Sequence, residues 1–203
     1  MTNEAPKFGG HLRFWERWFG PVEVHEARRI FNLVLEGKKP SALFQSTIIT
    51  QRDISELERL DCEVVPVVPT HEEDRGPDAY AIALEGKKFP EGDVQKQTQE
   101  LIKKFSDNPA FQAELSSLIE QTSGKSLAET LGAAHQGATS GERSAVHAAL
   151  EGIALGYMAC DVEYFVRTRY FDESTRYEPE NSDPQYGHAI CKKCAIALGL
   201  RNG

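Results

Sequence analysis

The sequence lacks long hydrophobic runs and is poor in cysteine, and these absences exclude several classes of protein. No apolar run approaches the ~18 residues of a membrane-spanning helix, so we expect no membrane span. Residues 1–10 contain no hydrophobic segment of the kind found in secretory signal peptides. With only four cysteines and no secretory context, we expect reduced thiols in a cytoplasmic protein.

Positive charge is also in short supply. The chain carries 23 Lys and Arg against 31 Asp and Glu, which gives a formal net charge of −8. A nucleic-acid-binding protein needs a basic face to neutralise phosphates, so we expect no nucleic-acid partner. An acidic chain stays soluble through self-repulsion, and it also suits a protein partner with a basic surface.

The hydrophobic content is ordinary and is sufficient for a core. Hydrophobic residues make up 40% of the 203 residues, and they include ten Phe and six Tyr. A chain of this size buries most of its apolar surface on folding, and it needs neither a disulfide nor a metal merely to fold. We therefore expect a globular protein.

The first part of the chain, residues 1–92, mixes helical and strand patterns. Gly37 is a natural end for the second of two predicted helices, and Asp53 is predicted to cap a third that runs to Leu60. Pro66 restricts its strand to an edge of the sheet or to a bulge, because proline lacks an N–H. The predicted helices are 11–19, 21–36 and 53–60, and the predicted strands are 43–50, 62–68 and 79–84.

Residues 93–203 have a helical pattern and end in a Cys-x-x-Cys motif. Asn108-Pro109 predicts a helix start, and so do capping boxes at Ser126 to Glu129 and at Thr139 to Glu142. The last of these predicts one long helix to about Arg169. The fold class is therefore α+β and predominantly α-helical, with a sheet of two or three strands in 1–92, and the two parts can form one continuous domain.

The C-terminal motif is where residue spacing points most directly to chemistry. Cys191 and Cys194 are three residues apart, as in the sites where one turn supplies two zinc ligands. His188 precedes Cys191 by three residues and is a candidate third ligand. The stretch Ile190 to Ala195 resembles the second half of treble-clef zinc sites. A fourth ligand must come from elsewhere, and residues of the right type are Cys62, Cys160, His25 and His71.

The motif has two other interpretations, because no second paired motif accompanies it. Two free thiols on a terminal helix are favoured over a structural zinc site. A thiol-based or zinc-based redox sensor at Cys191 and Cys194 is the third interpretation, although a thioredoxin-like motif normally opens a long helix inside a βαβ unit.

A second set of residues suggests a different chemistry. Asp78, Glu85 and Lys87 form a PD…ExK pattern that resembles the motif of restriction-like nucleases. In that motif two carboxylates hold Mg²⁺ and the lysine steadies water or phosphate. Only six residues separate Asp78 from Glu85, which is too few for the usual hairpin, and Glu72, Glu73 or Asp74 of the preceding acidic turn could replace Asp78 at a better distance. A solvated turn and a strand end are the favoured interpretation of these residues.

Another pair lies on the predicted long helix. His147 and Glu151 are four residues apart, and Asp161 lies within about 80° of them on a helical wheel, an arrangement that can build a metal site in a helical bundle. A surface pair of His147 and Glu151 on one helix face is the favoured interpretation.

The leading functional hypothesis is a non-enzymatic cytoplasmic protein that binds another protein, of the regulator, inhibitor or immunity type. It rests on the acidic composition and on the lack of an assembled catalytic set. Trp15 and Trp18 are the candidate partner-binding residues, because tryptophan is favoured at the centres of interfaces. A metal-dependent hydrolase or nuclease and a thiol or zinc redox sensor are the alternatives.

Overall fold

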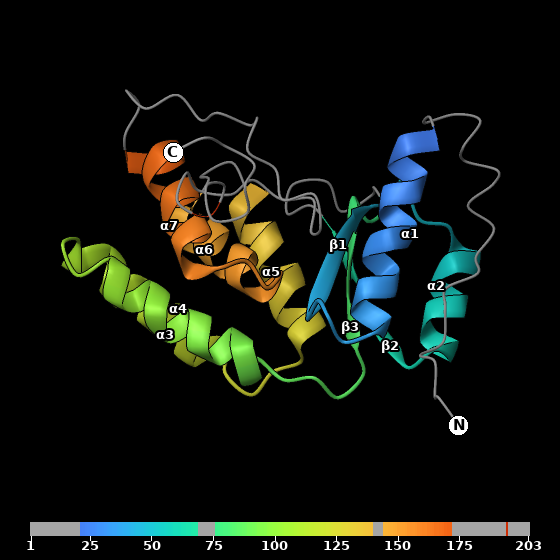
Figure 1. Ribbon diagram of the computed structural model, residues 1–203, viewed down its shortest axis with the longest axis horizontal. Helices are drawn as coiled ribbons and strands as arrows, with labels where there is room; N and C mark the ends of the chain where they lie inside the picture. The colour runs from blue at the N-terminus through green and yellow to red at the C-terminus, as the bar shows by residue number, and fades with distance from the viewer. Residues whose placement is uncertain (1–20, 69–75, 140–143, 172–193, 195–203) are drawn as a thin grey trace.

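The computed structural model describes residues 21–68, 76–139, 144–171 and 194 (Figure 1). Within these ranges the chain forms seven α-helices, a short π-helix and three strands, so the predicted α+β, mainly helical class is confirmed. None of the described helices is long and apolar enough to cross a membrane. The elements are α1 (Pro21–Leu35), β1 (Ser41–Gln45), α2 (Gln51–Arg59), β2 (Cys62–Val67), β3 (Ala79–Leu84), α3 (Gly92–Lys104), α4 (Pro109–Thr122), α5 (Leu127–Thr139), α6 (Ala145–Ala154), α7 (Ala159–Val166) and η2 (Arg167–Phe171).

The three strands form an antiparallel sheet in the order β1-β3-β2, with β3 in the centre. Pro66 lies on β2, opposite Tyr80, and is exposed. An edge strand tolerates this proline, because the position on its outer side needs no N–H donor. The prediction that Pro66 belongs to an edge strand is therefore confirmed.

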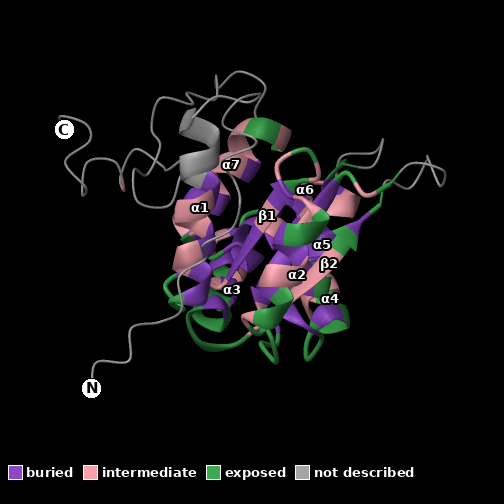
Figure 2. Ribbon diagram, turned by 90° about the vertical axis from the view of Figure 1, so that its right-hand side faces the viewer, coloured by how far each residue is buried: buried purple, intermediate pink, exposed green. Residues whose placement is uncertain are grey.

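Helices cover both faces of the sheet, which lies between α1 and α2 on one side and α3 to α7 on the other (Figure 1). Alternate residues of β3 serve the two sides: Ile82 packs with α1 and α2, whereas Ala81 and Ala83 pack with the other helices. Figure 2 shows buried residues where the helices meet the sheet. Small side chains let α5 approach closely, and a Cβ on Gly132 would lie 3.8 Å from that of Ala81.

At most of the described helices, a side chain beside the first helical residue caps the helix. Asn108 accepts a hydrogen bond from the Phe111 N–H at the start of α4, and Ser126 accepts one from the Glu129 N–H in α5. The predicted N-cap of α2, Asp53, lies three residues after the N-cap in the structure. Thr50 is the N-cap, and Asp53 is the third helical residue, whose carboxylate accepts from the Thr50 N–H to complete a capping box.

The predicted long helix to Arg169 is wrong, because the chain breaks between α6 and α7. Gly156 lies in the break with a φ of +84°, a conformation that glycine adopts most easily. A Cβ at this position would come within 2.5 Å of the Pro40 side chain. The Lys39 ammonium donates to the Leu155 carbonyl at 2.8 Å, and the Ser41 hydroxyl donates to the Ala154 carbonyl at 2.7 Å. Contacts distant in sequence therefore end α6.

The start of α6 also differs from the prediction. Thr139 is the last residue of α5, and its hydroxyl donates to the His135 carbonyl. Ser144 is the N-cap of α6 and accepts a hydrogen bond from the His147 N–H. Thr139 therefore ends one helix and does not cap the next.

Candidate metal centre

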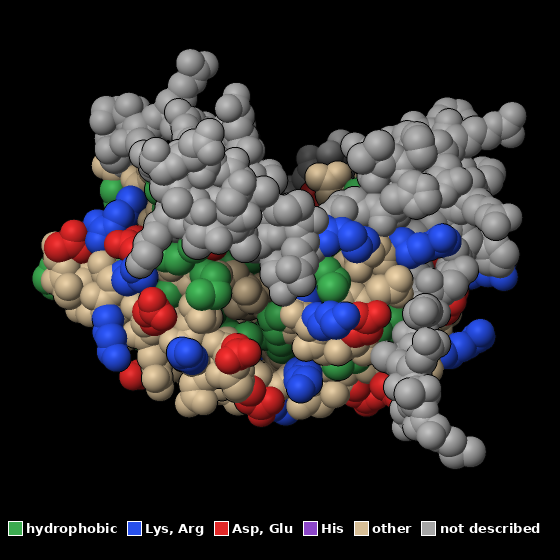
Figure 3. Space-filling view, viewed as in Figure 1, with side chains coloured by type: hydrophobic (Ala, Val, Ile, Leu, Met, Phe, Trp, Pro, Cys, Tyr) green, Lys and Arg blue, Asp and Glu red, His purple; other side chains and the backbone are tan. Residues whose placement is uncertain are grey.

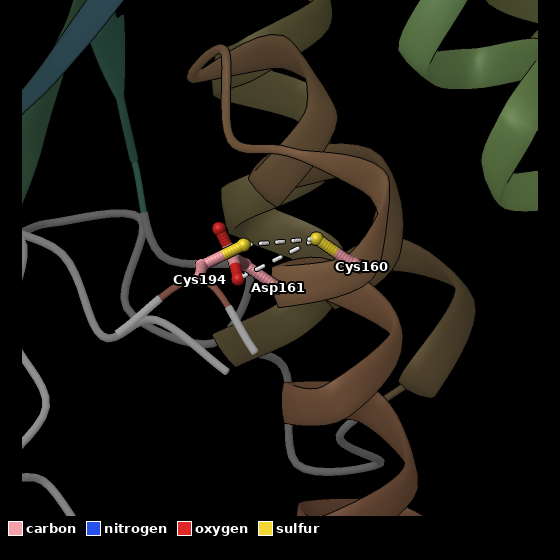
Figure 4. A group of neighbouring side chains, drawn as sticks. All are labelled: Cys160, Asp161 and Cys194. Carbon is pink, nitrogen blue, oxygen red and sulfur yellow. Dashed lines mark hydrogen bonds between the residues drawn. The ribbon is translucent and has the colours of Figure 1, made fainter. Parts of the chain in front are cut away.

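The candidate site lies at the start of α7. Met158 is the N-cap, so Cys160 and Asp161 lie in the first turn. Asp161 is buried with 3% of its surface exposed, and Cys160 is half-buried. Cys194 reaches the same place from 34 residues further along the chain. Figure 4 shows the two sulfur atoms directed toward each other, with the Asp161 carboxylate beside them.

The distances between these side chains suit a shared metal ion. The two Sγ atoms are 3.3 Å apart, and Cys160 Sγ lies 3.7 Å from Oδ1 of Asp161. The three ligand atoms all lie within 4.8 Å of one another. In a tetrahedral site with Zn–S bonds of about 2.3 Å and Zn–O bonds of about 2.1 Å, the S–S edge is about 3.8 Å and the S–O edge about 3.6 Å. The S–S distance is about 0.5 Å shorter than the first edge, and the distance from Cys160 Sγ to Oδ1 of Asp161 is within about 0.1 Å of the second.

The surroundings of the site favour anionic ligands. The N-terminal end of a helix carries partial positive charge from its free N–H groups, which stabilises thiolate and carboxylate groups in its first turn. A buried carboxylate such as Asp161 is costly unless it is paired or bound to a metal. A divalent cation between these three groups would add positive charge at a place where the helix end already favours anions.

Helix α7 is held in place at its start by α3. The Ala159 N–H donates to Oε1 of Gln97 at 2.8 Å, which ties the first turn of α7 to α3. Cys160 and Asp161 directly follow this bonded residue, so their backbone position is fixed by the packing of two helices.

A charged network holds the other end of α7. Arg167 donates to both carboxylate oxygens of Asp107, at 3.0 and 2.8 Å, and to the Lys104 carbonyl. It also donates to Oε1 of Glu163 at 3.1 Å, one turn earlier in α7. The hydrogen bond to Asp107 raises the pKa of Arg167, and in return the guanidinium lowers the pKa of Asp107. The helix that carries the candidate ligands is thus fastened at both ends.

The structure brings together some of the predicted ligands. Cys194, from the terminal motif, meets Cys160, which the sequence offered as one of four remote ligands. Cys62 does not take part, because it begins β2 and packs with α1 and α2 on the opposite face of the sheet. Burial, with a smaller contribution from Asp61, raises the pKa of the Cys62 thiol to about 11. The other candidates, Cys191, His188, His71 and the side chain of His25, lie outside the described residues.

Sequence reasoning grouped Asp161 with His147 and Glu151 and not with the cysteines. A single carboxylate beside a cysteine is not a recognised motif, and the pattern around it predicted the interior of a long helix. The signal became visible only when the break at Gly156 placed Cys160 and Asp161 in a first turn.

The nuclease-like residues are not brought together. Asp78 directly precedes β3 and Glu85 directly follows it, so they lie at opposite ends of a six-residue strand. At about 3.3 Å per residue these ends are about 20 Å apart, whereas carboxylates that share a Mg²⁺ ion lie about 2 Å from it. Lys87 is close to Glu85 in sequence but cannot bridge this separation. The arrangement that the nuclease alternative requires is therefore missing at these three residues, while Glu72, Glu73 and Asp74 lie outside the described residues.

The predicted pair of His147 and Glu151 is replaced by a contact between helices. Nδ1 of His135, on α5, lies 3.1 Å from Oε1 of Glu151, on α6. His147 instead packs over Gly137 of α5, and its buried Nδ1 has no hydrogen-bond partner among the described residues. The crossing of α5 and α6 therefore decides which histidine meets the glutamate.

The candidate partner-binding residues, Trp15 and Trp18, lie outside the described residues. Figure 3 shows Lys and Arg side chains interspersed with Asp and Glu over the described part of one face of the molecule. On that face the net negative charge is not gathered into a single patch. Binding of a basic protein partner stays a prediction.

No known protein family matches this chain, and neither a curated protein nor a solved structure matches it. The geometry at Cys160, Asp161 and Cys194 is therefore the basis for the functional proposal.

Proposed function

We propose that this protein is a non-enzymatic, zinc-binding regulatory protein whose metal ion binds Cys160, Asp161 and Cys194. One observation supports the proposal above all others: ligand atoms from two segments, 34 residues apart, lie within 4.8 Å of one another. Chance proximity of one thiol and one carboxylate is common. A second thiol that arrives from a distant segment at 3.3 Å is a more specific arrangement.

The types of ligand favour zinc. Mg²⁺ and Ca²⁺ bind through oxygen atoms, so two cysteines argue against both ions. Thiolates bind Zn²⁺ and Cu(I), and a carboxylate in the set suits Zn²⁺, which accepts sulfur, nitrogen and oxygen ligands in a tetrahedron.

The terminal motif would complete the site. Cys191 precedes Cys194 by three residues, and this spacing allows both sulfurs to bind one ion. His188 is the other nearby residue of suitable type. Four protein ligands would leave no open position for substrate, which is the property of a structural zinc site. The ion would fasten the C-terminal segment to α7, and the protein would act through the surface formed in this way, on a partner with basic charge.

Metal analysis of the full-length protein tests the proposal. After purification without chelators, elemental analysis should find about one zinc per chain. Cys160→Ser, Asp161→Asn and Cys194→Ser should each lower the zinc content. Loss of an outer hydrogen-bond partner alone costs about 10–100-fold in metal affinity, so we expect loss of a ligand to cost at least about 100-fold.

Cys62→Ser is the matched control, because Cys62 lies on the other face of the sheet. Its zinc content should equal that of the unmodified protein, and circular dichroism should show that every variant is folded. A metal-free wild-type protein, or undiminished zinc in Cys160→Ser, would rule the proposal out.

A further inference from the structure

The two sulfur atoms of the candidate metal centre are also within reach of a covalent bond. Cys160 Sγ and Cys194 Sγ are 3.3 Å apart, compared with about 2.05 Å in a disulfide. We propose that Cys160 and Cys194 form a reversible disulfide, so that the centre exchanges a bound metal ion for a sulfur–sulfur bond. The exchange rests on the proposed zinc site, but formation of the disulfide does not.

The geometry requires only a small movement. The sulfur atoms must approach by about 1.3 Å, which a rotation about the Cα–Cβ bond of either cysteine can provide. The sulfurs already point toward each other (Figure 4). The start of α7 is tied to α3 through Gln97 and Ala159, so Cys160 offers a fixed position to which Cys194 can bond.

Accessibility separates this pair from Cys62. Cys160 and Cys194 are half-buried, so small reagents from solvent can reach them. Cys62 is only 5% exposed in the core between the sheet and helices α1 and α2. Its environment disfavours the reactive thiolate, because burial raises the pKa of Cys62 to about 11. Oxidation should therefore be selective for the pair at α7.

The oxidant in this proposal is a low-molecular-weight disulfide of the glutathione type. The thiolate of one cysteine attacks a sulfur of this disulfide, which forms a mixed disulfide and releases one small thiolate. The thiolate of the second cysteine then attacks the protein sulfur of the mixed disulfide. This step forms the Cys160–Cys194 bond and releases the second small thiol. The protein dithiol loses two electrons and two protons, and the small disulfide gains both.

Oxidation and metal binding would oppose each other. A disulfide removes two thiolate ligands and leaves Asp161 as the remaining described ligand. Bound zinc in turn occupies the same sulfur electron pairs that attack the oxidant. By linkage, zinc should slow oxidation, and oxidation should release zinc.

Treatment of the full-length protein with oxidised glutathione tests this inference. The metal-free and zinc-loaded forms are compared, and disulfide-linked peptides are mapped by mass spectrometry without reduction. A chromogenic chelator follows zinc release in parallel. The variants are Cys160→Ser, in which the bond cannot form, Cys62→Ser as the matched control, and Cys191→Ser, which removes the competing partner of Cys194.

We expect a Cys160–Cys194 peptide in the wild-type, Cys62→Ser and Cys191→Ser proteins. Stoichiometric zinc should slow its formation at least about fivefold, and zinc should appear in solution as the bond forms. If the peptide forms but the protein binds no zinc, the disulfide stands and the proposed metal function fails. If zinc binds but oxidation yields only Cys191–Cys194, or no disulfide, this inference is overturned and the metal function stands.

Discussion

At the scale of single residues, the surroundings of each cysteine decide its chemistry. Cys62 opens a strand and is enclosed by the side chains of α1 and α2, where burial disfavours a thiolate charge. Cys160 lies in the first turn of a helix, where the partial positive charge of the helix end favours an anion, and it has a second thiol beside it. The same residue type is therefore inert in one place and a candidate ligand in the other.

The raised pKa of Cys62 predicts a loss of stability at alkaline pH. The thiol ionises near pH 9.0 in the unfolded chain and near pH 11 in the folded protein. Between these values the unfolded state releases the proton first, so the free energy of unfolding falls with rising pH in this window. Below pH 9 the contribution is fully present.

Chemical denaturation at pH 8, 9, 10 and 11 measures this effect. Cys62→Ala lacks the thiol, so its free energy of unfolding should decrease less steeply above pH 9 than that of the wild type. Equal slopes for the two proteins would contradict the prediction. In the folded protein at pH 8, a thiol reagent should label Cys160 and leave Cys62 unmodified until denaturant is added.

The individual ligands were predictable only in part. Cys194 belongs to a motif with metal-binding spacing, and Cys160 was among the residues of suitable type. No local pattern could select Cys160 over Cys62, because the choice depends on which face of the sheet each cysteine occupies. Asp161 was grouped with His147 and Glu151, because the sequence pattern concealed the helix start that places it beside Cys160.

At the scale of the elements, the break between α6 and α7 is the feature on which the site depends. Gly156 has a positive φ, and its Cα faces Pro40 so closely that a Cβ would lie 2.5 Å from the proline ring. Without this break, Cys160 and Asp161 would be in the interior of a longer helix. Their place in a first turn follows from the break.

Gly156→Ala should be more destabilising than the same change at a glycine with open space. The control is Gly124→Ala: φ is +78° there, and nothing lies within 4 Å of the added Cβ. Left-handed backbone strain of about 1–2 kcal/mol applies to both variants. The overlap with Pro40 should add about 1–3 kcal/mol at Gly156, measured by chemical denaturation. Equal losses of stability in the two variants would contradict this prediction, because the overlap with Pro40 would then be relieved at no cost in free energy.

The crossing of α5 and α6 gives a second prediction. A Cβ on Gly137 would come within 2.1 Å of the His147 ring, so Gly137→Ala should displace the ring and cost about 1–3 kcal/mol. Adding His147→Ala should recover most of this loss, because the obstacle is removed. The non-additivity is measured as a double-mutant cycle from urea denaturation.

Gly132→Ala on the same helix is the control. Its added Cβ would make contacts of 3.4 to 3.8 Å, which are ordinary packing distances. This substitution should be close to neutral, since the higher helix propensity of alanine offsets small adjustments. A Gly137→Ala loss that persists unchanged in the His147→Ala background would contradict the steric explanation.

Element starts were predictable where they depend on a few consecutive residues. Asn108-Pro109 and Ser126 gave correct helix starts from local hydrogen bonds alone. The end of α6 was not predictable, because its last carbonyls bond to Lys39 and Ser41, more than 110 residues away in the chain. An alanine-rich run gives no sign that such contacts interrupt it.

At the scale of the whole molecule, two hydrophobic clusters lie on opposite faces of one small sheet. The segment that leads into β1 connects them. Lys39 is only 5% exposed, donates to the Leu155 carbonyl and lies over the Tyr157 ring at 4.8 Å. A cation at the C-terminal end of α6 also complements the partial negative charge of the helix end. The hydrogen bond from Lys39 to Leu155 therefore holds the break between α6 and α7 next to the segment that leads into β1.

Lys39→Met should therefore destabilise the protein. The substitution keeps a chain of similar length but removes the donor to Leu155, so we expect a loss of about 1–3 kcal/mol in the free energy of unfolding. The neighbouring Lys38→Met is the control. Its ammonium pairs with Glu36 at 2.7 Å on a largely exposed side chain, and such pairs contribute about 0–1 kcal/mol. Thermal and chemical denaturation should show a clearly larger loss of stability in Lys39→Met than in Lys38→Met. A similar small effect for both would contradict the connecting role of Lys39.

The overall class of the fold followed from hydrophobic periodicity, because strands and helices are each coded over a few residues. The meeting of Cys194 with α7 was not predictable in this way. It depends on a contact between residues 34 apart in the sequence, and no periodicity encodes such a contact. The sequence therefore indicated half a candidate metal site, and the structure places Cys160 and Asp161 beside Cys194.

The most direct test is the zinc content of the wild-type protein beside that of Cys160→Ser, both purified without chelator and both shown to be folded. We predict about one zinc per chain in the wild type and its loss in the variant. No zinc in the wild type, or equal zinc in both proteins, would contradict the assignment of Cys160, Asp161 and Cys194 as a metal centre.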